Sequence, residues 1–164
     1  MPVISDTSPI SSLAIIGRLS LLRSQFSEIC IPPAVLQELM DHPNRKALGA
    51  IETAIQDRWI RMIAPAPSRL LSVLLVHLHS GEAEAIALAA ELNADMVIID
   101  EQEGRQFAMQ AGLRVTGVLG ILLRAKKSGD LIALKPEIQS LRTKARFFVA
   151  SSLETRILQI AEEA

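Results

Sequence analysis

The sequence is short of cysteine and of aromatic residues, and each shortage excludes a class of protein. Cys30 is the one cysteine in 164 residues, so an intramolecular disulfide and a zinc site built from several cysteines are both excluded. We expect this cysteine to pack as a small hydrophobic residue in a strand. There is no tyrosine, and aromatic residues make up only 3% of the chain. This composition argues against a platform on which single-stranded nucleic acid stacks its bases.

The chain also lacks an excess of positive charge. It has 17 Lys and Arg residues against 18 Asp and Glu residues, for a net charge of -1. No global electrostatic field therefore attracts nucleic acid to the protein. Binding of RNA or DNA would need a local basic patch or phosphates bridged by a metal ion.

Long apolar runs are missing as well. The longest run, at residues 70–78, is interrupted by Ser72 and His77 and is too short to span a bilayer. The N-terminus has no basic region and reaches Asp6 almost at once, so we recognise no cleavable signal peptide. These features predict a cytoplasmic protein without a membrane segment.

What the sequence has in quantity is apolar residues, arranged in alternating strand-like and helix-like pieces. Hydrophobic residues make up 49% of the chain, which is enough to bury a sizeable core. Helical stretches separate strands predicted at residues 3–4, 29–31, 59–63, 96–99 and 113–115. This alternation predicts a single domain over residues 1–164, with a three-layer α/β/α fold and a mainly parallel central sheet. The C-terminal helices, from about residue 135, either pack on the core or form an interface.

The first predicted strand ends at an acidic residue. Asp6 follows the β-branched pair at residues 3–4, and Ser8 and Pro9 are typical of a helix start, with Ser8 as its cap. Ligands bind at the carboxyl ends of the strands in open α/β sheets. Asp6 is therefore either a structural acid at the start of a helix or a metal ligand.

Three further acids are expected at the same edge of the sheet. Asp100 ends the strand at residues 96–99, and adjacent strands lie about 4.8 Å apart, so Asp6 and Asp100 approach each other if their strands are neighbours. Glu82 opens the helix before that strand, and Glu38 lies on the helix after the strand at residues 29–31. Carboxylates gathered in this way need a counter-charge. A hard divalent cation with oxygen ligands, Mg²⁺ or Mn²⁺, would supply it.

Each of these acids also has a structural explanation. Glu82 and Glu84 are favourable beside a helix N-terminus because of the helix dipole alone. Glu38 can be a solvated helix residue, and Asp100 and Glu101 can cap the next helix. The set of four acids, more than any one of them, favours a metal site.

Several short motifs occur in a fixed order along the chain. A strand ending in Asp before Thr and Ser, a strand and helix carrying Glu, and a buried strand ending in Asp stand at residues 3–8 (VISDTS), 31–39 (IPPAVLQEL) and 96–100 (MVIID). Residues 81–85 (GEAEA), 101–105 (EQEGR) and 115–120 (VTGVLG) complete the pattern. In this order the motifs resemble the PIN-domain superfamily of Mg²⁺-dependent ribonucleases, in particular an uncharacterised PIN-like subfamily. Glu82 stands where most members have Asp, and Glu84 is an alternative for that position.

The resemblance implies metal-dependent hydrolysis of RNA phosphodiester bonds, in a family that includes the toxins of toxin–antitoxin pairs. It implies a catalytic set that also holds Mg²⁺ or Mn²⁺, namely Asp6, Glu38, Glu82 and Asp100. Residues around this set are expected to hydrogen-bond a ligand or to contact the substrate phosphate: Thr7, Ser8, Glu84, Glu101, Arg105, Thr116 and Lys126. For Arg105 and Lys126 the alternative is a solvated helix charge. The expected partners are RNA, an antitoxin protein and a second copy of the chain in a homodimer.

Two functions of other classes stay open at this point. One is a catalytically silent PIN-like module that binds a protein partner or nucleic acid, for which the C-terminal helices could supply the interface. The other is a phosphotransfer domain. A receiver domain has paired acids at its first strand, where this chain has only Asp6, and a haloacid-type phosphatase has a second Asp where Ser8 stands.

Overall fold

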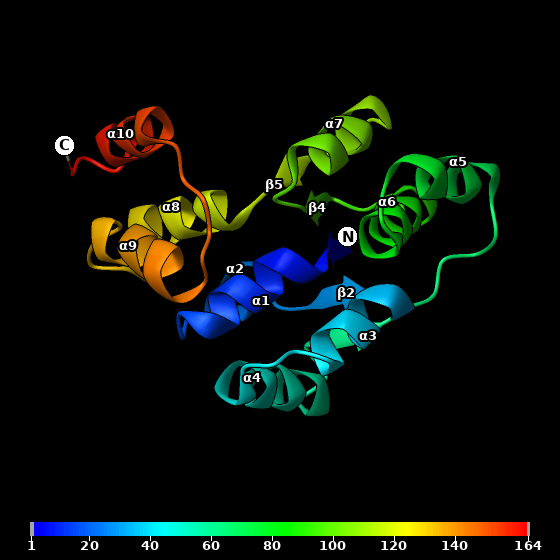
Figure 1. The fold of residues 1–164 in the computed structure, drawn as a ribbon, viewed down its shortest axis with the longest axis horizontal. Helices are drawn as coiled ribbons and strands as arrows, with labels where there is room; N and C mark the ends of the chain where they lie inside the picture. Colours follow the sequence, from blue (N-terminus) through cyan, green and yellow to red (C-terminus); the bar gives the residue numbers. More distant parts are fainter. Residues whose placement is uncertain (1, 164) are drawn as a thin grey trace.

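A computed structural model describes residues 2–163 and shows a five-stranded sheet flanked by helices on both faces (Figure 1). The strand order is β3-β2-β1-β4-β5, and each neighbouring pair is parallel. The predicted three-layer α/β/α fold with a mainly parallel sheet is confirmed. The strands are β1 (Val3–Ser5), β2 (Ile29–Ile31), β3 (Ile60–Met62), β4 (Met96–Ile98) and β5 (Val115–Thr116).

The two faces of the sheet carry separate apolar clusters. One is shared by α1 to α4 and α8 to α10, and the other by α5, α6 and α7. Successive side chains of a strand point to opposite faces. Ile29 and Ile31 therefore enter the first cluster, whereas Cys30 is buried in the second, as expected. The helices are α1 (Thr7–Ile15), α2 (Ser20–Phe26), α3 (Pro33–Met40), α4 (Arg45–Gln56), α5 (Arg69–His77), α6 (Ser80–Glu91), α7 (Gln102–Gln110), α8 (Val118–Ser128), α9 (Lys135–Lys144) and α10 (Ser151–Ile160). None of them is long and apolar enough to cross a membrane.

The start of α1 differs from the sequence prediction. The helix begins at Thr7, with Asp6 in the N-cap position, rather than after a cap at Ser8. The Ser8 hydroxyl donates a hydrogen bond to Asp100 Oδ2 at 3.3 Å. The prediction failed because it assigned Ser8 to its own helix terminus, whereas a carboxylate on the neighbouring strand competes for the hydroxyl.

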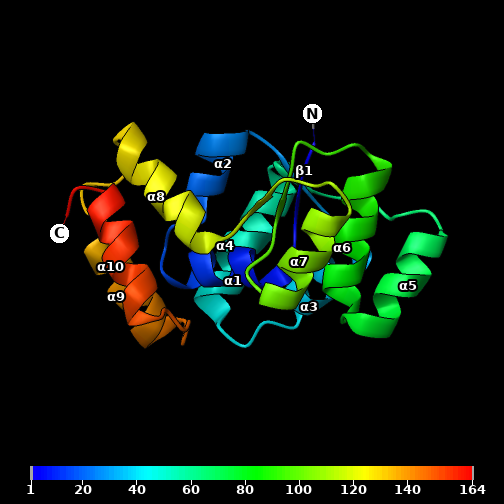
Figure 2. The same ribbon diagram turned by 90° about the horizontal axis from the view of Figure 1, so that it is seen from above.

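The C-terminal helices pack beside α8 at one end of the molecule, as both ribbon views show (Figure 2). Leu141, Val149 and Ile157 are buried in the same apolar cluster as α1 and α3. Arg18, between α1 and α2, ties α9 to the N-terminal part of the chain. Its Nε and Nη2 donate hydrogen bonds to the buried Glu137 Oε1 at 3.0 and 2.6 Å.

The strand order places a topological switch point between β1 and β4. The chain leaves β1 toward β2 and β3 on one side, and it returns to β4 and β5 on the other. Ser5 pairs in register with Ile98, so β1 and β4 end at nearly the same level. In open α/β sheets a crevice forms outside the carboxyl ends of the strands at such a point.

Candidate acidic site

Asp6 lies at the end of β1 and is the most buried of the predicted acids. Its backbone amide donates to Ile98 O at 3.0 Å, which ties this residue to β4. The residue is only 1% exposed, and its Oδ1 has no hydrogen-bond partner among the described residues. The carboxylate also makes no capping hydrogen bond to α1, although Asp6 occupies the N-cap position. A buried carboxylate oxygen without a donor is costly, so this geometry favours a ligand role over a structural one.

Glu82 approaches Asp6 from the first turn of α6. It is 3% exposed, and its Oε1 lies 3.0 Å from His79 Nε2. His79 is the N-cap residue of α6, and its Nδ1 accepts a long hydrogen bond from the Glu82 amide at 3.5 Å. Asp6, His79 and Glu82 each offer one potential ligand atom, and these three atoms lie within 4.8 Å of one another. The three residues together could hold a metal ion.

Glu38 completes the group from α3, and Gly81 makes room for it. The Glu38 side chain is half-exposed, and its Oε1 lies 4.0 Å from His79 Nδ1. A β-carbon added at Gly81 would stand 2.7 Å from Glu38 Oε1 and 3.0 Å from Asp6 Oδ1. Glycine is therefore needed at this position because two carboxylates from different elements pack against the α6 backbone.

Asp100 lies beside this group and holds the start of α8. Its Oδ1 accepts from the Val118 amide at 2.8 Å, and its Oδ2 accepts from Ser8. A β-carbon at Gly117 would stand 2.6 Å from Asp100 Oδ1 and 2.9 Å from Arg105 Nη1. Arg105 Nη1 in turn donates to Ile99 O at 2.9 Å. Asp100 thus caps α8 rather than α7, the next helix in the chain.

The acids line adjoining hollows of the surface. Asp6, Glu38 and His79 line a hollow of about 280 Å³. Asp100 lines its neighbour of about 470 Å³, and the two hollows share Ser8 and Glu101. Three of the predicted acids, Asp6, Glu38 and Asp100, therefore open onto one continuous depression. Glu82 is buried behind it, against Asp6 and His79.

Burial dominates the electrostatics of the group. It raises the pKa of Asp6 to about 7; the Thr7 amide and His79 lower this pKa, while Glu82 and Glu38 raise it further. The pKa of Glu82 is also raised, chiefly by burial, with His79 acting in the opposite direction. Each carboxyl resists ionisation because it leaves water and faces like charges. A cation among them would remove this penalty, so the donor set fits a hard divalent ion.

Burial likewise raises the pKa of Asp100. Hydrogen bonds from the Val118 amide and the Ser8 hydroxyl, and the charge of Arg105, act in the opposite direction. Asp100 is therefore better supplied with donors than Asp6, whose Oδ1 has none.

Two residues predicted near the acids have other partners. Glu84 Oε2 accepts from the Ala34 amide at 2.9 Å, so it caps the first turn of α3, and Glu82 is the residue that faces the acidic group. The prediction that Lys126 faces this edge was wrong. Its Nζ donates to Ile132 O at 2.7 Å and lies 3.7 Å from Glu163 Oε2. It stands eight positions after Val118, which places it about 12 Å further along α8.

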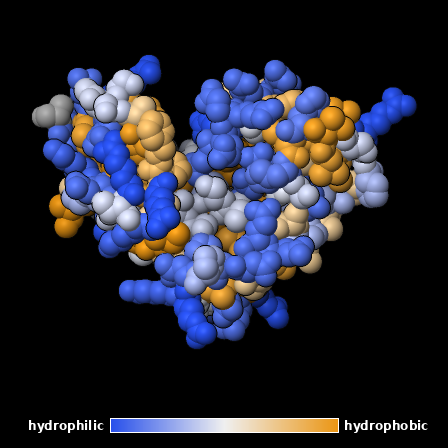
Figure 3. All heavy atoms as spheres, viewed as in Figure 1, coloured by the Kyte–Doolittle hydropathy of each residue, from blue (hydrophilic) through white to orange (hydrophobic). Residues whose placement is uncertain are grey.

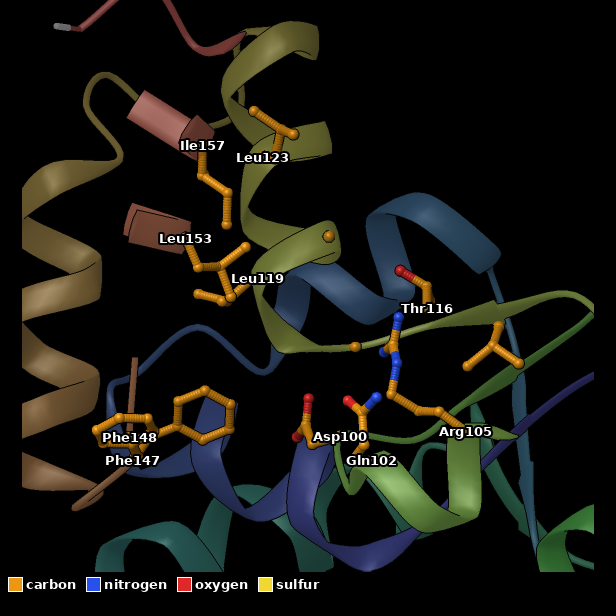
Figure 4. A pocket seen from close by; sticks show the side chains of 13 residues that line it. Asp100, Gln102, Arg105, Thr116, Leu119, Leu123, Phe147, Phe148, Leu153 and Ile157 are labelled. Atoms are coloured by element: carbon orange, nitrogen blue, oxygen red, sulfur yellow. The ribbon is translucent and has the colours of Figure 1, made fainter. Parts of the chain in front are cut away.

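The remaining predicted residues lie around the depression. Thr7 lines the hollow of Asp6, and its buried Oγ1 has no hydrogen-bond partner among the described residues. Glu101 is exposed at the N-cap of α7 and borders both hollows. Arg105 and Thr116 stand together on the far side of Asp100, in a third hollow (Figure 4).

His79, Gly81 and Gly117 were not assigned a role from the sequence. His79 precedes Glu82 by three residues, a spacing that puts two side chains on the same face of a helical turn. The helix start was predicted at Glu82, which left His79 outside it. The glycines belong to the quoted motifs, but their importance depends on side chains from elsewhere in the chain that pack against them: Asp6 and Glu38 at Gly81, and Asp100 and Arg105 at Gly117.

Comparisons with known proteins agree with this architecture. A family model described as a PIN domain matches residues 2–163. A similar solved structure is a PilT N-terminus domain protein from the hyperthermophilic archaeon Sulfolobus solfataricus P2, with 20% sequence identity and a TM-score of 0.52. The similarity covers 76% of this chain and 93% of the archaeal one, and at this identity it supports the fold alone. No curated protein matches the sequence.

Proposed function

The chain belongs to the PIN-domain family, and from that premise we propose that it is a metal-dependent ribonuclease that hydrolyses phosphodiester bonds at the acidic site. One observation carries the proposal. Asp6 Oδ1 is a buried carboxylate oxygen without a hydrogen-bond donor, and it lies beside Glu38 and Glu82 at the switch point of a parallel sheet. A structural acid would be paired, whereas a metal ligand is left free for the ion.

The residues present fit Mg²⁺ or Mn²⁺. Asp6, Glu38, Glu82 and Asp100 would hold the ion, because Asp6, Glu38 and Asp100 line one depression and Glu82 offers a carboxylate oxygen beside Asp6. When bound, such an ion polarises a phosphodiester and lowers the pKa of water. His79 offers a nitrogen to the same group, and its contact with Glu82 orients that carboxylate.

Other side chains prepare the site for a phosphate. Ser8 donates to Asp100 and fixes the orientation of its carboxylate, as groups around metal ligands do. The buried Thr7 hydroxyl has no partner among the described residues, and we propose that it donates to an oxygen bound in the hollow of Asp6. Arg105 is the cation beside Asp100, and we propose that it attracts the phosphate that enters there.

Cleavage of a mixed RNA panel in Mg²⁺, in Mn²⁺ and in EDTA tests the proposal. The wild type should cut in either metal and not in EDTA, and Asp100→Asn should lose cutting because an amide lacks the charge that a hard cation needs. Asp41→Asn is the matched control, since Asp41 is an exposed acid at the C-cap of α3. Cutting that persists in Asp100→Asn would overturn the assignment.

A second candidate is a catalytically silent PIN-like module that binds a protein partner. The observation that favours it is an exposed apolar face on α5, where Val73, Leu75 and Val76 are 54%, 46% and 79% exposed. Apolar side chains gather over this part of the molecule in the space-filling view (Figure 3). A folded wild type that cuts no RNA in either metal would favour this candidate.

We also propose that the partner of such a face is an antitoxin or a second copy of the chain, in a cytoplasmic toxin. Light scattering tests the second option: a homodimer through α5 should dissociate in Val76→Glu. A wild type that stays monomeric at high concentration would contradict the homodimer.

A further inference from the structure

A third hollow, of about 460 Å³, lies on the far side of Asp100 and has two unlike walls (Figure 4). One wall is polar and consists of Asp100, Gln102, Arg105 and Thr116. The other is apolar and comes from α8 and the C-terminal segment: Leu119, Leu123, Phe147, Phe148, Leu153 and Ile157. Its volume is in the range of sites for small organic groups.

Phe148 is the unusual residue of this hollow because it is 86% exposed. The loop that carries it is held in place. The Phe147 amide donates to Leu141 O at 2.9 Å, and Arg142 Nη2 donates to Val149 O at 2.8 Å while pairing with Glu154. The flanking residue Val149 is buried. The loop thus presents an aromatic ring to solvent on a fixed support.

The hollow is continuous with the acidic site. Between them lies the hollow of about 470 Å³ that Asp100 lines, here called the middle hollow. The hollow of Asp6 shares Ser8, Ser12, Glu101 and Ala145 with it. The middle hollow in turn shares its other end with the aromatic one, through Asp100, Gln102, Phe147 and Phe148. In the space-filling view the surface is hollowed between the C-terminal helices and α7, in agreement with this track (Figure 3).

The chemistry along the track matches a nucleotide. Arg105 stands at one side, and Arg146, which lines the middle hollow, makes no hydrogen bond or ion pair within residues 2–163. Both can attract phosphates. The Gln102 amide and the Thr116 hydroxyl can hydrogen-bond the edge of a base, while the rings of Phe147 and Phe148 offer faces for stacking. A purely apolar peptide segment would leave the polar wall without partners.

We propose that this hollow binds the base of an unpaired RNA nucleotide next to the phosphate held at the acidic site, with Phe148 stacking on the base. The inference rests on the proposed ribonuclease function and adds to it one base-binding subsite, built by the loop between α9 and α10. A base held in a duplex cannot enter, because its faces are already stacked. The low aromatic content excludes a platform of many stacked bases, and a single subsite needs only the ring that the loop presents.

Binding of a labelled single-stranded RNA oligonucleotide in Ca²⁺, which is used to keep the RNA intact, tests this subsite. Phe148→Ala should bind roughly fivefold to a hundredfold more weakly than the wild type, which is the range for loss of one base–aromatic stack. Phe148→Trp should restore binding. Ile132→Ala is the matched control, because it shortens an apolar side chain that is 96% exposed between α8 and α9, outside the three hollows, and should bind normally.

A single abasic nucleotide moved along the oligonucleotide provides a second readout. One position should weaken binding to the wild type while leaving binding to Phe148→Ala unchanged, since the stacking partner is already lost. Equal binding by wild type and Phe148→Ala, with no sensitive abasic position, would overturn the subsite and leave the hollow to a protein segment.

The outcomes separate this inference from the proposed hydrolysis. RNA binding that depends on Phe148 without any cleavage in Mg²⁺ or Mn²⁺ would support the subsite and contradict the hydrolysis. Cleavage whose KM is the same in wild type and Phe148→Ala would support the hydrolysis and contradict the subsite. A wild type that binds no single-stranded RNA would overturn both.

Discussion

Asp6 combines the lowest exposure of the acids with an oxygen that no donor reaches. Its pKa is raised from the usual 3.8 of an aspartate to about 7, mainly by burial. An acid whose pKa is higher in the folded state stabilises the fold fully below its unfolded pKa, near 4, and this contribution is lost as the pH rises through about 7. Asp6 therefore opposes folding of the metal-free protein at alkaline pH.

We accordingly predict that Asp6→Asn stabilises the metal-free protein. In EDTA at pH 8 its free energy of unfolding should exceed that of the wild type by about 2–4 kcal/mol, because no charge is buried. The difference should shrink toward pH 4. Urea unfolding across this pH range measures it, with Asp41→Asn as the exposed control. A less stable Asp6→Asn at pH 8 would contradict the assigned burial of an unpaired charge.

A divalent cation should reverse the penalty. We predict that Mg²⁺ or Mn²⁺ raises the melting temperature of the wild type at pH 8 and has less effect at pH 5, where protons compete for Asp6 and Glu82. Thermal unfolding with and without the ion measures this. The shift should disappear in Asp6→Asn, and an equal shift in both proteins would place the ion elsewhere.

Gly81 gives a sharper test of the site's packing. A methyl group at this position would meet Glu38 Oε1 at 2.7 Å and Asp6 Oδ1 at 3.0 Å. We predict that Gly81→Ala lowers metal-dependent cleavage roughly tenfold or more by displacing these carboxylates.

Gly49→Ala is the matched control for this variant. Gly49 is also inside a helix, but nothing lies within 4 Å of the added carbon. It should gain about 0.5–1 kcal/mol of stability from helix propensity and keep full activity. If Gly81→Ala retains wild-type rates, the two carboxylates do not depend on this close approach.

At the scale of secondary-structure elements, two helix N-termini organise the acids. The start of α6 carries His79, Gly81 and Glu82 within one turn, and the start of α8 is capped by Asp100. The sequence predicted both helices from their apolar periodicity. It also predicted Glu82 at the start of α6. It did not predict the role of His79 or the need for glycine at residues 81 and 117, because that need comes from side chains of distant elements.

The two roles of Asp100 can be separated by substitution. Asn keeps an oxygen that accepts from the Val118 amide, whereas Ala does not. We predict that both variants lose cleavage, and that only Asp100→Ala loses a further 1 kcal/mol or so of stability, the usual effect of removing a helix cap. Denaturant unfolding beside the cleavage assay measures both effects. Equal stabilities for the two variants would show that the cap contributes nothing.

Lys126 shows the limit of placing charges from helix periodicity. The sequence puts it on the helix after β5. Periodicity alone does not show how far along that helix a side chain can still reach the acidic site at the end of the sheet. In the fold, Lys126 neutralises Glu163 near the C-terminal end of α8, and Arg105 is the cation that stands beside Asp100.

At the scale of the whole molecule, the parallel sheet could be predicted because its strands are short apolar runs separated by amphipathic helices. The strand order could not, since it depends on which apolar faces meet in space. The order puts β1 beside β4, and this neighbourhood brings Asp6 and Asp100 to one depression.

The C-terminal segment illustrates the same limit. Its apolar residues suited either the core or an interface, and the fold divides them between the two environments. Leu141, Val149 and Ile157 are buried in the core, whereas Phe148 and Leu153 are exposed and line the hollow beside Asp100. Periodicity does not make this division, because the exposed ring sits on a loop between helices.

The most direct measurement is the single-turnover cleavage rate of a single-stranded RNA as a function of Mg²⁺ concentration, for the wild type and Asp6→Asn. The wild-type rate should rise with Mg²⁺ and saturate. Asp6→Asn should be slower by roughly a hundredfold or more at every concentration, because several kcal/mol of charge stabilisation depend on the bound ion. Equal rates for the two proteins, or a rate that is independent of the metal, would contradict a ribonuclease centred on Asp6.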